Sequence, residues 1–479
     1  MKKSNLIAVI FVTIFTVALM ILTISGYESE KKLEAVLAKA QEEGVAFKVE
    51  DLRSTRPEGT KFFDGPAEAS AVAFLLSPQA AWRGSGVYVE DWSWFQTNFK
   101  AYRVFHLTSD EEEEVRTVIQ ENETLISEMK RVSQLPPTSL VDVARLSGLD
   151  SQVVDNMYAP NLHACRAFAN LLVLDSYVAW RNKRTSDSLE TLVNILDLSE
   201  HIRDIPDSLS QVIGMGASGV AIQYLAEWLT LEEPAIPRDA ERAFLSRIPS
   251  LKRREGIAQA FNLEMIAGLQ AVSMDFGTQH FGMDMRIYSS LPGKIMQLKD
   301  KYMITIVSLT GKQMRLSKQP YFELIADSRQ LWDEFMNTAP WKRGFVSTRT
   351  VPYFSRDGRY QAEHETRLNQ ARIALALNRY KQDSGEYPEE LAKLVPQYLE
   401  EIPLDMFTGK EMLYYRDGES YVLYSVGVNE KSDLSKTKSD TNKRKFVTGK
   451  GATFYLPPSQ GRIDIVWGAR EVLRKREQK

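Results

Sequence analysis

Hydrophobic and polar residues follow three different patterns along the chain, and each pattern predicts a different kind of structure. The first pattern is an uninterrupted apolar run without a charged residue, Leu6–Ile24. The second, between about residues 110 and 336, is a series of segments with apolar residues at helical spacing. The third, after residue 356, is a long helical segment followed by strand-like stretches and turn residues. Together they predict a mainly α-helical chain with a C-terminal α+β module.

The apolar run predicts a single transmembrane helix. As a helix, Leu6–Ile24 would rise roughly 28 Å, close to the thickness of one hydrocarbon core. Lys2 and Lys3 precede it, so the positive-inside tendency places the N-terminus in the cytoplasm. A cleaved signal peptide is the alternative, although the run is long for a signal-peptide core and Thr23–Gly26 lacks the usual cleavage pattern. We favour an uncleaved anchor, and both interpretations place the residues from about 26 onward outside the cytoplasm.

The segment after the apolar run predicts a stalk that continues the membrane helix. Residues 28–43 form a helical pattern, and Gly44 ends it. The apolar face of this helix consists of Leu33, Val36, Leu37 and Ala40. A mixed segment rich in Gly and Pro then extends to about Gly86.

Four aromatic residues at helical spacing follow that mixed segment: Trp92, Phe95, Phe99 and Tyr102. We interpret them as a core-facing stripe, with a carbohydrate platform or a membrane-surface contact as the alternatives. Thr108 precedes Glu111 with the spacing of a capping box. The acidic run Glu111–Glu114 therefore indicates the first turn of a helix rather than a metal site, because carboxylates there complement the helix dipole.

A helical domain is predicted between these signals and about residue 340. Its prolines indicate boundaries between helices, since proline interrupts the helical hydrogen-bond pattern. The expected helices lie near residues 110–132, 138–148, 159–182, 186–203, 207–231, 238–246, 254–275, 293–315 and 318–336. Short connections between them suggest stacked helical hairpins, although no fixed repeat period is present.

Composition and charge exclude several functional classes. At 479 residues the chain predicts two or three folding units. A formal charge of -3 argues against a dedicated nucleic-acid binder. The single cysteine, Cys165, excludes an intramolecular disulfide and any site built from several cysteines. The five histidines do not form the i, i+4 pair that helical metal sites use.

Short motifs that suggest catalysis or cofactor binding lack the surroundings that they need. Gly214, Gly216 and Gly219 match G-x-G-x-x-G, but the pattern around them is helical, which favours close helix packing over dinucleotide binding. Ser-x-x-Lys occurs at Ser29, Ser127 and Ser435 without the partner motifs of penicillin-recognising enzymes. His163 and Cys165 are more typical of a buried helix than of a catalytic pair. We therefore expect no catalytic, cofactor-binding or metal-ligating residue and no cofactor.

Two basic segments lie near the C-terminus. Lys431–Lys450 has the composition of an exposed loop, and Arg470–Lys479 predicts an exposed terminal helix. Binding of an acidic envelope polymer or of lipid headgroups is the functional alternative for both segments.

The C-terminal module begins with a helix over about residues 359–383, which Gly385 ends, and continues with a second short helix from Pro388. A turn at Asp405–Gly409 precedes a hairpin of Met412–Arg416 and Tyr421–Val426, with Asp417-Gly418 as its turn. Further strands are expected at Ala452–Leu456 and Ile463–Trp467.

This order resembles the C-terminal domain of the major pseudopilin of type II secretion systems. The residues that carry the resemblance are Ala371, Ala374, Leu375, Tyr380, Gly385, Tyr387, Pro388, Leu391, Leu394, Pro396, Tyr398, Leu399, Ile402, Pro403, Asp405, Tyr421, Leu423, Tyr424, Ser425 and Gly427. They cover about sixty residues, an eighth of the chain. The resemblance implies a bacterial envelope setting and a helix-plus-sheet fold.

Two features differ from that family. Some 350 residues separate the apolar run from the module, and no Gly precedes the run as a processing site, so assembly as a pilus subunit is not expected. The family tends to hold calcium in the loop after the last matched strand. Here that loop offers Asn429, Asp433 and Asp440 among many lysines, a poor donor set for a hard cation.

The chain is thus expected to divide into five segments. They are the cytoplasmic tip and anchor (1–25), the stalk and aromatic-rich segment (26–108), the helical domain (109–340), the pseudopilin-like module (356–468) and the basic tail (469–479).

The expected function is non-enzymatic. We expect a single-pass protein of the bacterial inner membrane, with most of the chain in the periplasm and a structural or protein-interaction role linked to secretion or pilus-like assemblies. Its expected partners are the lipid bilayer, through Leu6–Ile24, and other envelope proteins, with no nucleic acid. An extracytoplasmic hydrolase whose residues converge only in the fold is the main alternative, and a receptor for a soluble ligand is a third.

Overall fold

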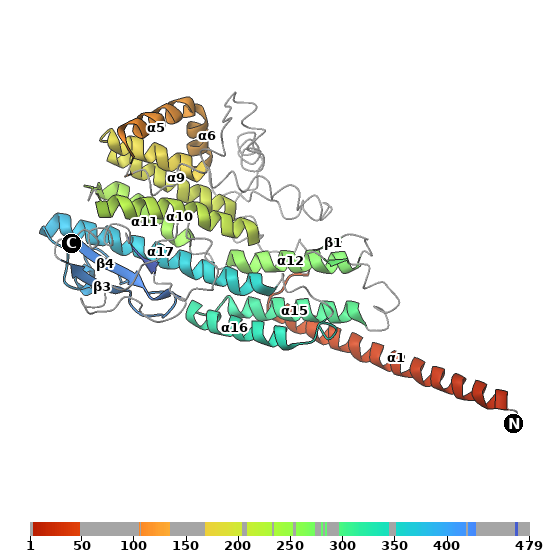
Figure 1. Ribbon diagram of the computed structural model, residues 1–479. Coiled ribbons are helices and arrows are strands. Elements are labelled where there is room, and N and C mark those ends of the chain that lie inside the picture. Colours follow the sequence, from red (N-terminus) through yellow and green to blue (C-terminus); the bar gives the residue numbers. More distant parts are fainter. Residues whose placement is uncertain are drawn as a thin grey trace. The chain divides into compact units, whose positions relative to one another are not determined.

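The computed structural model gives a mostly helical protein with two small antiparallel sheets among the residues that it describes (Figure 1). It describes residues 3–47, 105, 107–134, 168–203, 208–231, 234–251, 255–273, 279–280, 283–284, 297–343, 351–417, 420–427 and 465–467. The predicted aromatic stripe of Trp92–Tyr102, the helix near 138–148 and the strand Ala452–Leu456 lie outside these residues.

The chain divides into two compact units. The first unit comprises Met1–Arg53, Ala258–Gln319 and Glu323–Arg356, and the second comprises Ser54–Ile257, Pro320–Phe322 and Asp357–Lys479. The elements of the first unit are α1 (Lys3–Glu42), most of α12 (Glu255–Ser273), β1 (Gln279–His280), β2 (Met283–Asp284), α15 (Leu298–Leu316) and α16 (Tyr321–Asn337). The two short strands pair antiparallel.

Helix α1 continues without a break from the apolar run into the predicted stalk. Its last residue is Glu42, and Gly44 follows in the left-handed conformation with φ +89°, which glycine adopts without strain. Val45 N–H donates to the carbonyl of Ala40, so the helix ends in a hydrogen-bonded cap. The predicted helix over residues 28–43 and its end at Gly44 are therefore confirmed, within one residue.

In the second unit, the predicted capping box forms. Thr108 accepts a hydrogen bond from the backbone of Glu111, and the Glu111 side chain accepts one from the backbone of Thr108. The helix predicted over 110–132 is two helices, α5 (Ser109–Glu121) and α6 (Glu123–Ser133). Asn122 lies between them with φ −106° and ψ 16°, outside the helical region, and this departure divides the segment.

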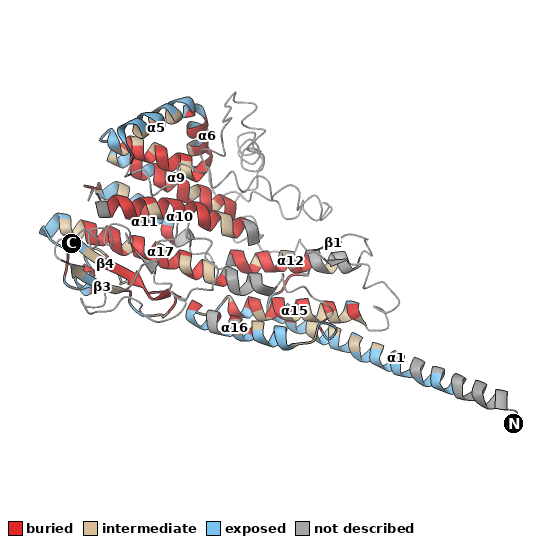
Figure 2. Ribbon diagram, viewed as in Figure 1, coloured by how far each residue is buried: buried red, intermediate tan, exposed pale blue. Residues whose placement is uncertain are grey.

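Helix α9 (Thr185–Arg203) is central to the second unit because it packs against α6, α10 (Ser208–Leu231) and α11 (Arg238–Leu251). A helix over residues 168–181 precedes it. Most residues of α9 are themselves buried, as Figure 2 shows in red. Gly214 of α10 allows a close approach, since a Cβ there would lie 2.9 Å from the Ser199 carbonyl oxygen of α9. The small-residue interpretation of the glycine motif is thus confirmed for Gly214.

Three predicted helix boundaries were wrong, each for a local reason. Helix α11 continues past Pro249 to Leu251, since a proline in the last turn removes only one hydrogen bond at an end that frays. Helix α15 begins at Leu298 rather than near 293, because Gln297 adopts a left-handed conformation with φ 52°. Helix α17 (Val351–Ser384) begins earlier than residue 359, with Pro352 in its first turn, where the missing N–H costs nothing.

The end of α17 and the sheet form the C-terminal module of the second unit. Gly385, at φ +84°, follows the last helical residue as predicted. The expected short helix is a single 3-10 turn, Leu391–Leu394. The predicted hairpin is confirmed as β3 (Leu413–Asp417) and β4 (Ser420–Ser425), with Tyr415 opposite Val422. The predicted turn at Asp417 was wrong, because Asp417 is the last residue of β3 and pairs with Ser420. Strand β5 (Ile465–Val466) extends the antiparallel sheet in the order β3-β4-β5.

Candidate functional site

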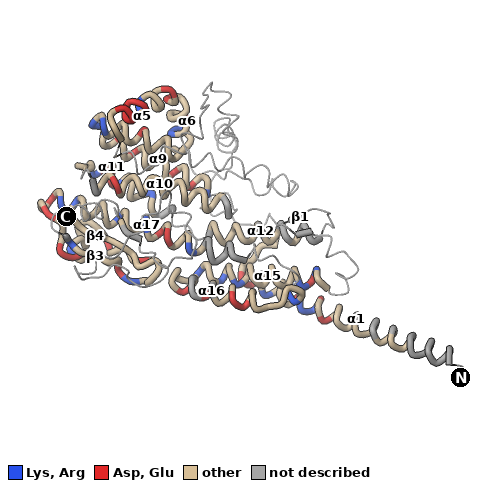
Figure 3. The backbone as a smooth tube through the Cα atoms, in the orientation of Figure 1, with Lys and Arg blue, Asp and Glu red and all other residues tan. Residues whose placement is uncertain are grey.

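The first candidate is the N-terminal half of α1, which exposes large apolar side chains. Ile14 is 63% exposed and Ile21 is 60% exposed. The other large apolar side chains exposed on this part of the helix are Val17, Met20 and Ile24. In Figure 3 the described residues of this outer part carry no charge, and the charged residues of α1 begin farther along, beside α15.

Hydropathy gives no membrane span among the described side chains. The side chains of residues 1–12 and of several positions up to Leu22 are not among the described ones. Within the described residues, no helix is long and apolar enough to cross a bilayer.

The C-terminal half of α1 packs on α15. Ala40 is buried, and a Cβ at Gly311 of α15 would lie 3.7 Å from the Ala40 methyl group. Arg315 pairs with Glu43 at 3.6 Å, while Gln297 donates a hydrogen bond to Ser25 at 3.1 Å. One helix thus presents exposed apolar residues at one end and a packed face at the other.

The second candidate is a buried polar segment of α17 in the second unit. Every residue from Gln361 to Gln370 except Glu363 and Arg367 is buried, and most of them are polar. Polar groups in a core are costly unless they find hydrogen-bond partners. The partners come from distant parts of the sequence, so the segment holds several elements together.

Arg203 and Glu365 anchor this polar cluster. Arg203 is buried at the end of α9 and donates to the Gln361 side chain at 3.0 Å. Glu365 accepts hydrogen bonds from Gln361 and from the Tyr321 hydroxyl, both at 3.0 Å. Asn369 donates to the carbonyl oxygen of Leu404, which ties α17 to the C-terminal module.

His364 is the titratable residue of the cluster with the most perturbed environment. Burial lowers its pKa well below the usual value, and the positive charges of Arg203 and Arg367 lower it further. Its Nε2 lies 3.4 Å from the Ser218 Oγ of α10. The ring is therefore neutral at pH 7, and Nδ1 has no hydrogen-bond partner among the described residues.

A serine beside a neutral histidine is the contact from which serine nucleophiles are built. Ser218 is fully buried, however, and its hydroxyl also donates within α10 to the carbonyls of Gly214 and Met215. A substrate would reach this pair only after α10 and α17 separate, so the observed geometry serves packing.

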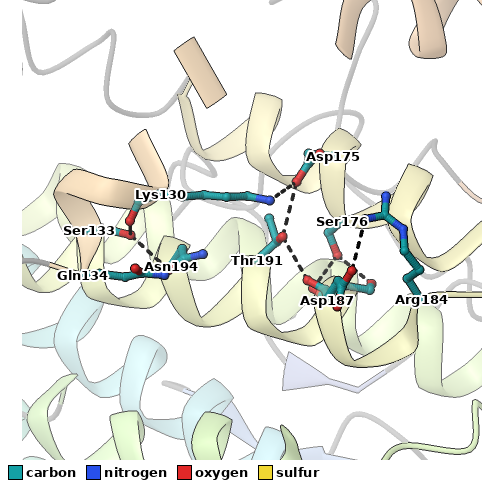
Figure 4. Close-up of polar contacts among 10 residues, drawn as sticks. Lys130, Ser133, Gln134, Asp175, Ser176, Arg184, Asp187, Thr191 and Asn194 are labelled. Carbon is teal, nitrogen blue, oxygen red and sulfur yellow. Dashed lines mark hydrogen bonds and ion pairs between the residues drawn. The ribbon is translucent and has the colours of Figure 1, made fainter. Parts of the chain in front are cut away.

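A second set of polar contacts connects α6, the helix over residues 168–181 and α9 (Figure 4). Lys130 pairs with Asp175, which also accepts a hydrogen bond from Thr191 at 3.3 Å. Ser133 of α6 donates to Asn194 of α9 at 3.1 Å. Lys130 is the lysine of one Ser-x-x-Lys match, and its contact with Asp175 gives it a structural role.

Asp405 in the C-terminal module is also structural. Burial raises its pKa, while hydrogen bonds from the backbone N–H groups of Phe407 and Val426 and from Ser425 oppose that rise. The carboxylate therefore closes the turn before the hairpin. Sequence reasoning identified this turn but did not assign it a buried acid.

Other residues discussed from the sequence lie outside the described residues. These are His163 and Cys165, the calcium candidates Asn429, Asp433 and Asp440, the loop Lys431–Lys450 and the basic tail. Within the described ranges, no group of three or more His, Cys, Asp and Glu residues is arranged to hold a metal ion.

Comparison with known proteins gives no match: no family model, no curated protein and no solved structure is significantly similar to the chain.

Proposed function

We propose that this protein is a membrane-anchored extracytoplasmic protein with a structural or protein-interaction role. In this proposal Leu6–Ile24 spans the bacterial inner membrane, Lys2 and Lys3 keep the N-terminus in the cytoplasm, and the residues after Ile24 lie in the periplasm.

The observation that carries the proposal is the exposure of apolar side chains on α1. Fully burying one large aliphatic side chain is worth about 1.5–3 kcal/mol, so five that are each about half exposed represent about 6 kcal/mol of unrealised stabilisation. The run from Leu6 to Ile24 has no charged residue on any side, so a bilayer matches it better than a partner that covers one face.

The C-terminal module supports an interaction role. Its helix, 3-10 turn and antiparallel hairpin follow the order expected from the pseudopilin resemblance. Such a module displayed at the far end of a tethered chain is suited to contact secretion or pilus-like components.

The test has two parts. Membranes from cells that produce the tagged chain are washed with alkaline carbonate, and the chain is expected to stay in the pellet. Crosslinking followed by purification is then expected to recover secretion or pilus-like components. A chain released by carbonate would refute the anchor, and a clean monomer after crosslinking would refute the interaction role.

An extracytoplasmic hydrolase is the second candidate, and it would use the buried contact between Ser218 and His364 only if α10 and α17 separate to admit a substrate. A fluorophosphonate probe would label a reactive serine. Labelling of the native chain that disappears in Ser218→Ala would support the hydrolase over the interaction role. Absence of labelling would remove Ser218 as a nucleophile.

A further inference from the structure

We propose that the first turn of α15 lies in the phospholipid headgroup layer. There Lys299 of α15 and Tyr27 of α1 contact the headgroups. The proposal rests on the insertion of Leu6–Ile24 proposed above and adds a second membrane contact, far from the first in sequence.

The register between α1 and α15 carries the inference. Ser25 and Gln297 exchange hydrogen bonds at 3.1 and 3.3 Å, and they are 272 residues apart. Glu43 and Arg315 pair at 3.6 Å with the same offset. The two helices therefore run in the same direction, side by side, over residues 25–43 and 297–315, as Figure 1 shows.

This register sets the height of α15 above the bilayer. Ser25 directly follows Ile24, the last residue of the apolar run, so Gln297 lies level with the edge of the hydrocarbon core. The headgroup region adds about 5–7 Å on each side of that core, which corresponds to about four or five helical residues. Residues 25–29 of α1 and 297–301 of α15 occupy this layer.

The side chains in the layer suit an interface. Tyr27 is 67% exposed, and tyrosine is enriched where hydrocarbon meets water. Lys299 is exposed on the first turn of α15, and a lysine there can extend its ammonium group to phosphates. Aliphatic residues follow farther into the membrane and charged residues follow outside it, so the polarity changes at the level that the register gives.

Charge alone does not drive this contact. Near the layer, Lys31, Lys32, Lys299 and Lys301 are offset by Glu28, Glu30 and Asp300, leaving a small positive excess. A single net charge contributes about 1 kcal/mol on an anionic surface. The contact is therefore expected on zwitterionic lipid as well, with only a modest increase when anionic lipid is added.

The test measures the depth of single labelled sites in the full chain. Cys165→Ser removes the only cysteine, and three variants then add one cysteine each: Met20→Cys, Lys299→Cys and Lys312→Cys. Each carries an environment-sensitive fluorophore in nanodiscs of phosphatidylcholine with a quencher either on the headgroup or on the acyl chain. Lys299 is exposed and the Lys312 side chain is 43% exposed, and the two lysines lie about 20 Å apart along α15, so they can be compared as a near and a far site on one helix.

The expected result is a graded pattern. The acyl-chain quencher acts on the label at 20, and the headgroup quencher removes about half of the fluorescence at 299 but little at 312, because only the first site lies within about 7 Å of the hydrocarbon edge. An unquenched label at 299, with quenching at 20, overturns this inference and leaves the anchor intact. Equal quenching at 299 and 312 also overturns it, because α15 would then lie along the surface. An unquenched label at 20 overturns both proposals.

Discussion

Gly214 is the residue at which α10 comes closest to α9, and it gives the first testable prediction. A Cβ at this position would lie 2.3 Å from the Arg203 Cγ and 2.9 Å from the Ser199 carbonyl oxygen. Gly214→Ala is therefore expected to lower the free energy of unfolding by about 2 kcal/mol, since overpacking outweighs the gain in helix propensity. Denaturant titration of the purified chain in detergent measures the change.

Gly216 provides the matched control for this prediction. It lies in the same helix, but a Cβ there meets nothing within 4 Å. Gly216→Ala is expected to leave stability unchanged or to raise it by up to about 1 kcal/mol, as helix propensity predicts. Equal effects of the two substitutions would show that helix propensity, and not the contact with α9, determines the role of Gly214.

His364 predicts how stability depends on pH. Burial and the charges of Arg203 and Arg367 lower its pKa in the folded state, whereas an unfolded histidine titrates near 6.5. Below pH 6.5 the unfolded chain binds a proton that the folded chain does not, so the contribution of His364 is complete above pH 6.5 and is lost as pH falls. One pH unit below 6.5, this loss is about 1.4 kcal/mol.

His364→Gln isolates this contribution, because glutamine stays neutral over the whole range. The variant is expected to be less stable at pH 7 but to lose less of its stability between pH 7 and 5.5 than the native chain does. Asp197 titrates in both proteins, with its pKa raised by burial to about 6, and its effect cancels in the comparison. Parallel pH profiles for the two proteins would show that His364 is not held neutral.

At the scale of elements, Arg379 predicts how α17 holds α11. Its guanidinium donates to Glu241 at 2.6 Å and to the Ile236 carbonyl at 2.7 Å, and both charged side chains are only 14% exposed. Arg379→Met leaves Glu241 without its partner in a site where burial already raises its pKa. We expect a loss of about 3 kcal/mol in the free energy of unfolding, measured by denaturant titration.

Arg238 is the control for this ion pair, since it joins the same two helices. It lies 3.6 Å from Asp383, but its side chain is 73% exposed. Arg238→Met is expected to change stability by less than about 1 kcal/mol, because solvent screens an exposed pair. A loss in Arg238→Met as large as that in Arg379→Met would contradict the importance given to burial.

The sequence predicted the elements well where local signals decide them. The capping box at Thr108, the glycines after α1 and α17, and the hairpin of β3 and β4 were all identified correctly, because each depends on residues close together in the chain. The break at Asn122 and the left-handed Gln297 were missed. Asparagine does not have to leave the helical region, and glutamine rarely adopts the left-handed one, so no local sequence pattern predicted either conformation.

At the scale of the whole molecule, the candidate sites divide in the same way. The apolar run of α1 is visible in the sequence because hydropathy is a local property. The polar cluster around Glu365 is not, since Arg203 and Gln361 are 158 residues apart and only the fold brings them together. From its sequence alone, a helical segment as polar as Gln361–Gln370 would be predicted to face solvent. It is buried because residues from distant parts of the chain supply hydrogen-bond partners for its polar groups.

Substitutions in the two halves of α1 are expected to affect different properties, which gives the last prediction. Those in the N-terminal half should reduce membrane retention, and those in the C-terminal half should reduce the stability of the fold. Replacing Ile14 and Ile21 with lysine places two charges in the proposed hydrocarbon layer and is expected to release the chain from carbonate-washed membranes. The same double variant should keep the melting temperature of the native protein, because both side chains are exposed and contribute little to packing.

Ala40→Glu should have the opposite effect, because it buries a carboxylate against α15. The variant is expected to stay in the membrane, while its free energy of unfolding falls by about 3 kcal/mol. Fractionation and thermal melting of both variants are measured in parallel. If the lysine variant both melted early and stayed in the membrane, the apolar half of α1 would be a packing element of the folded units rather than an anchor.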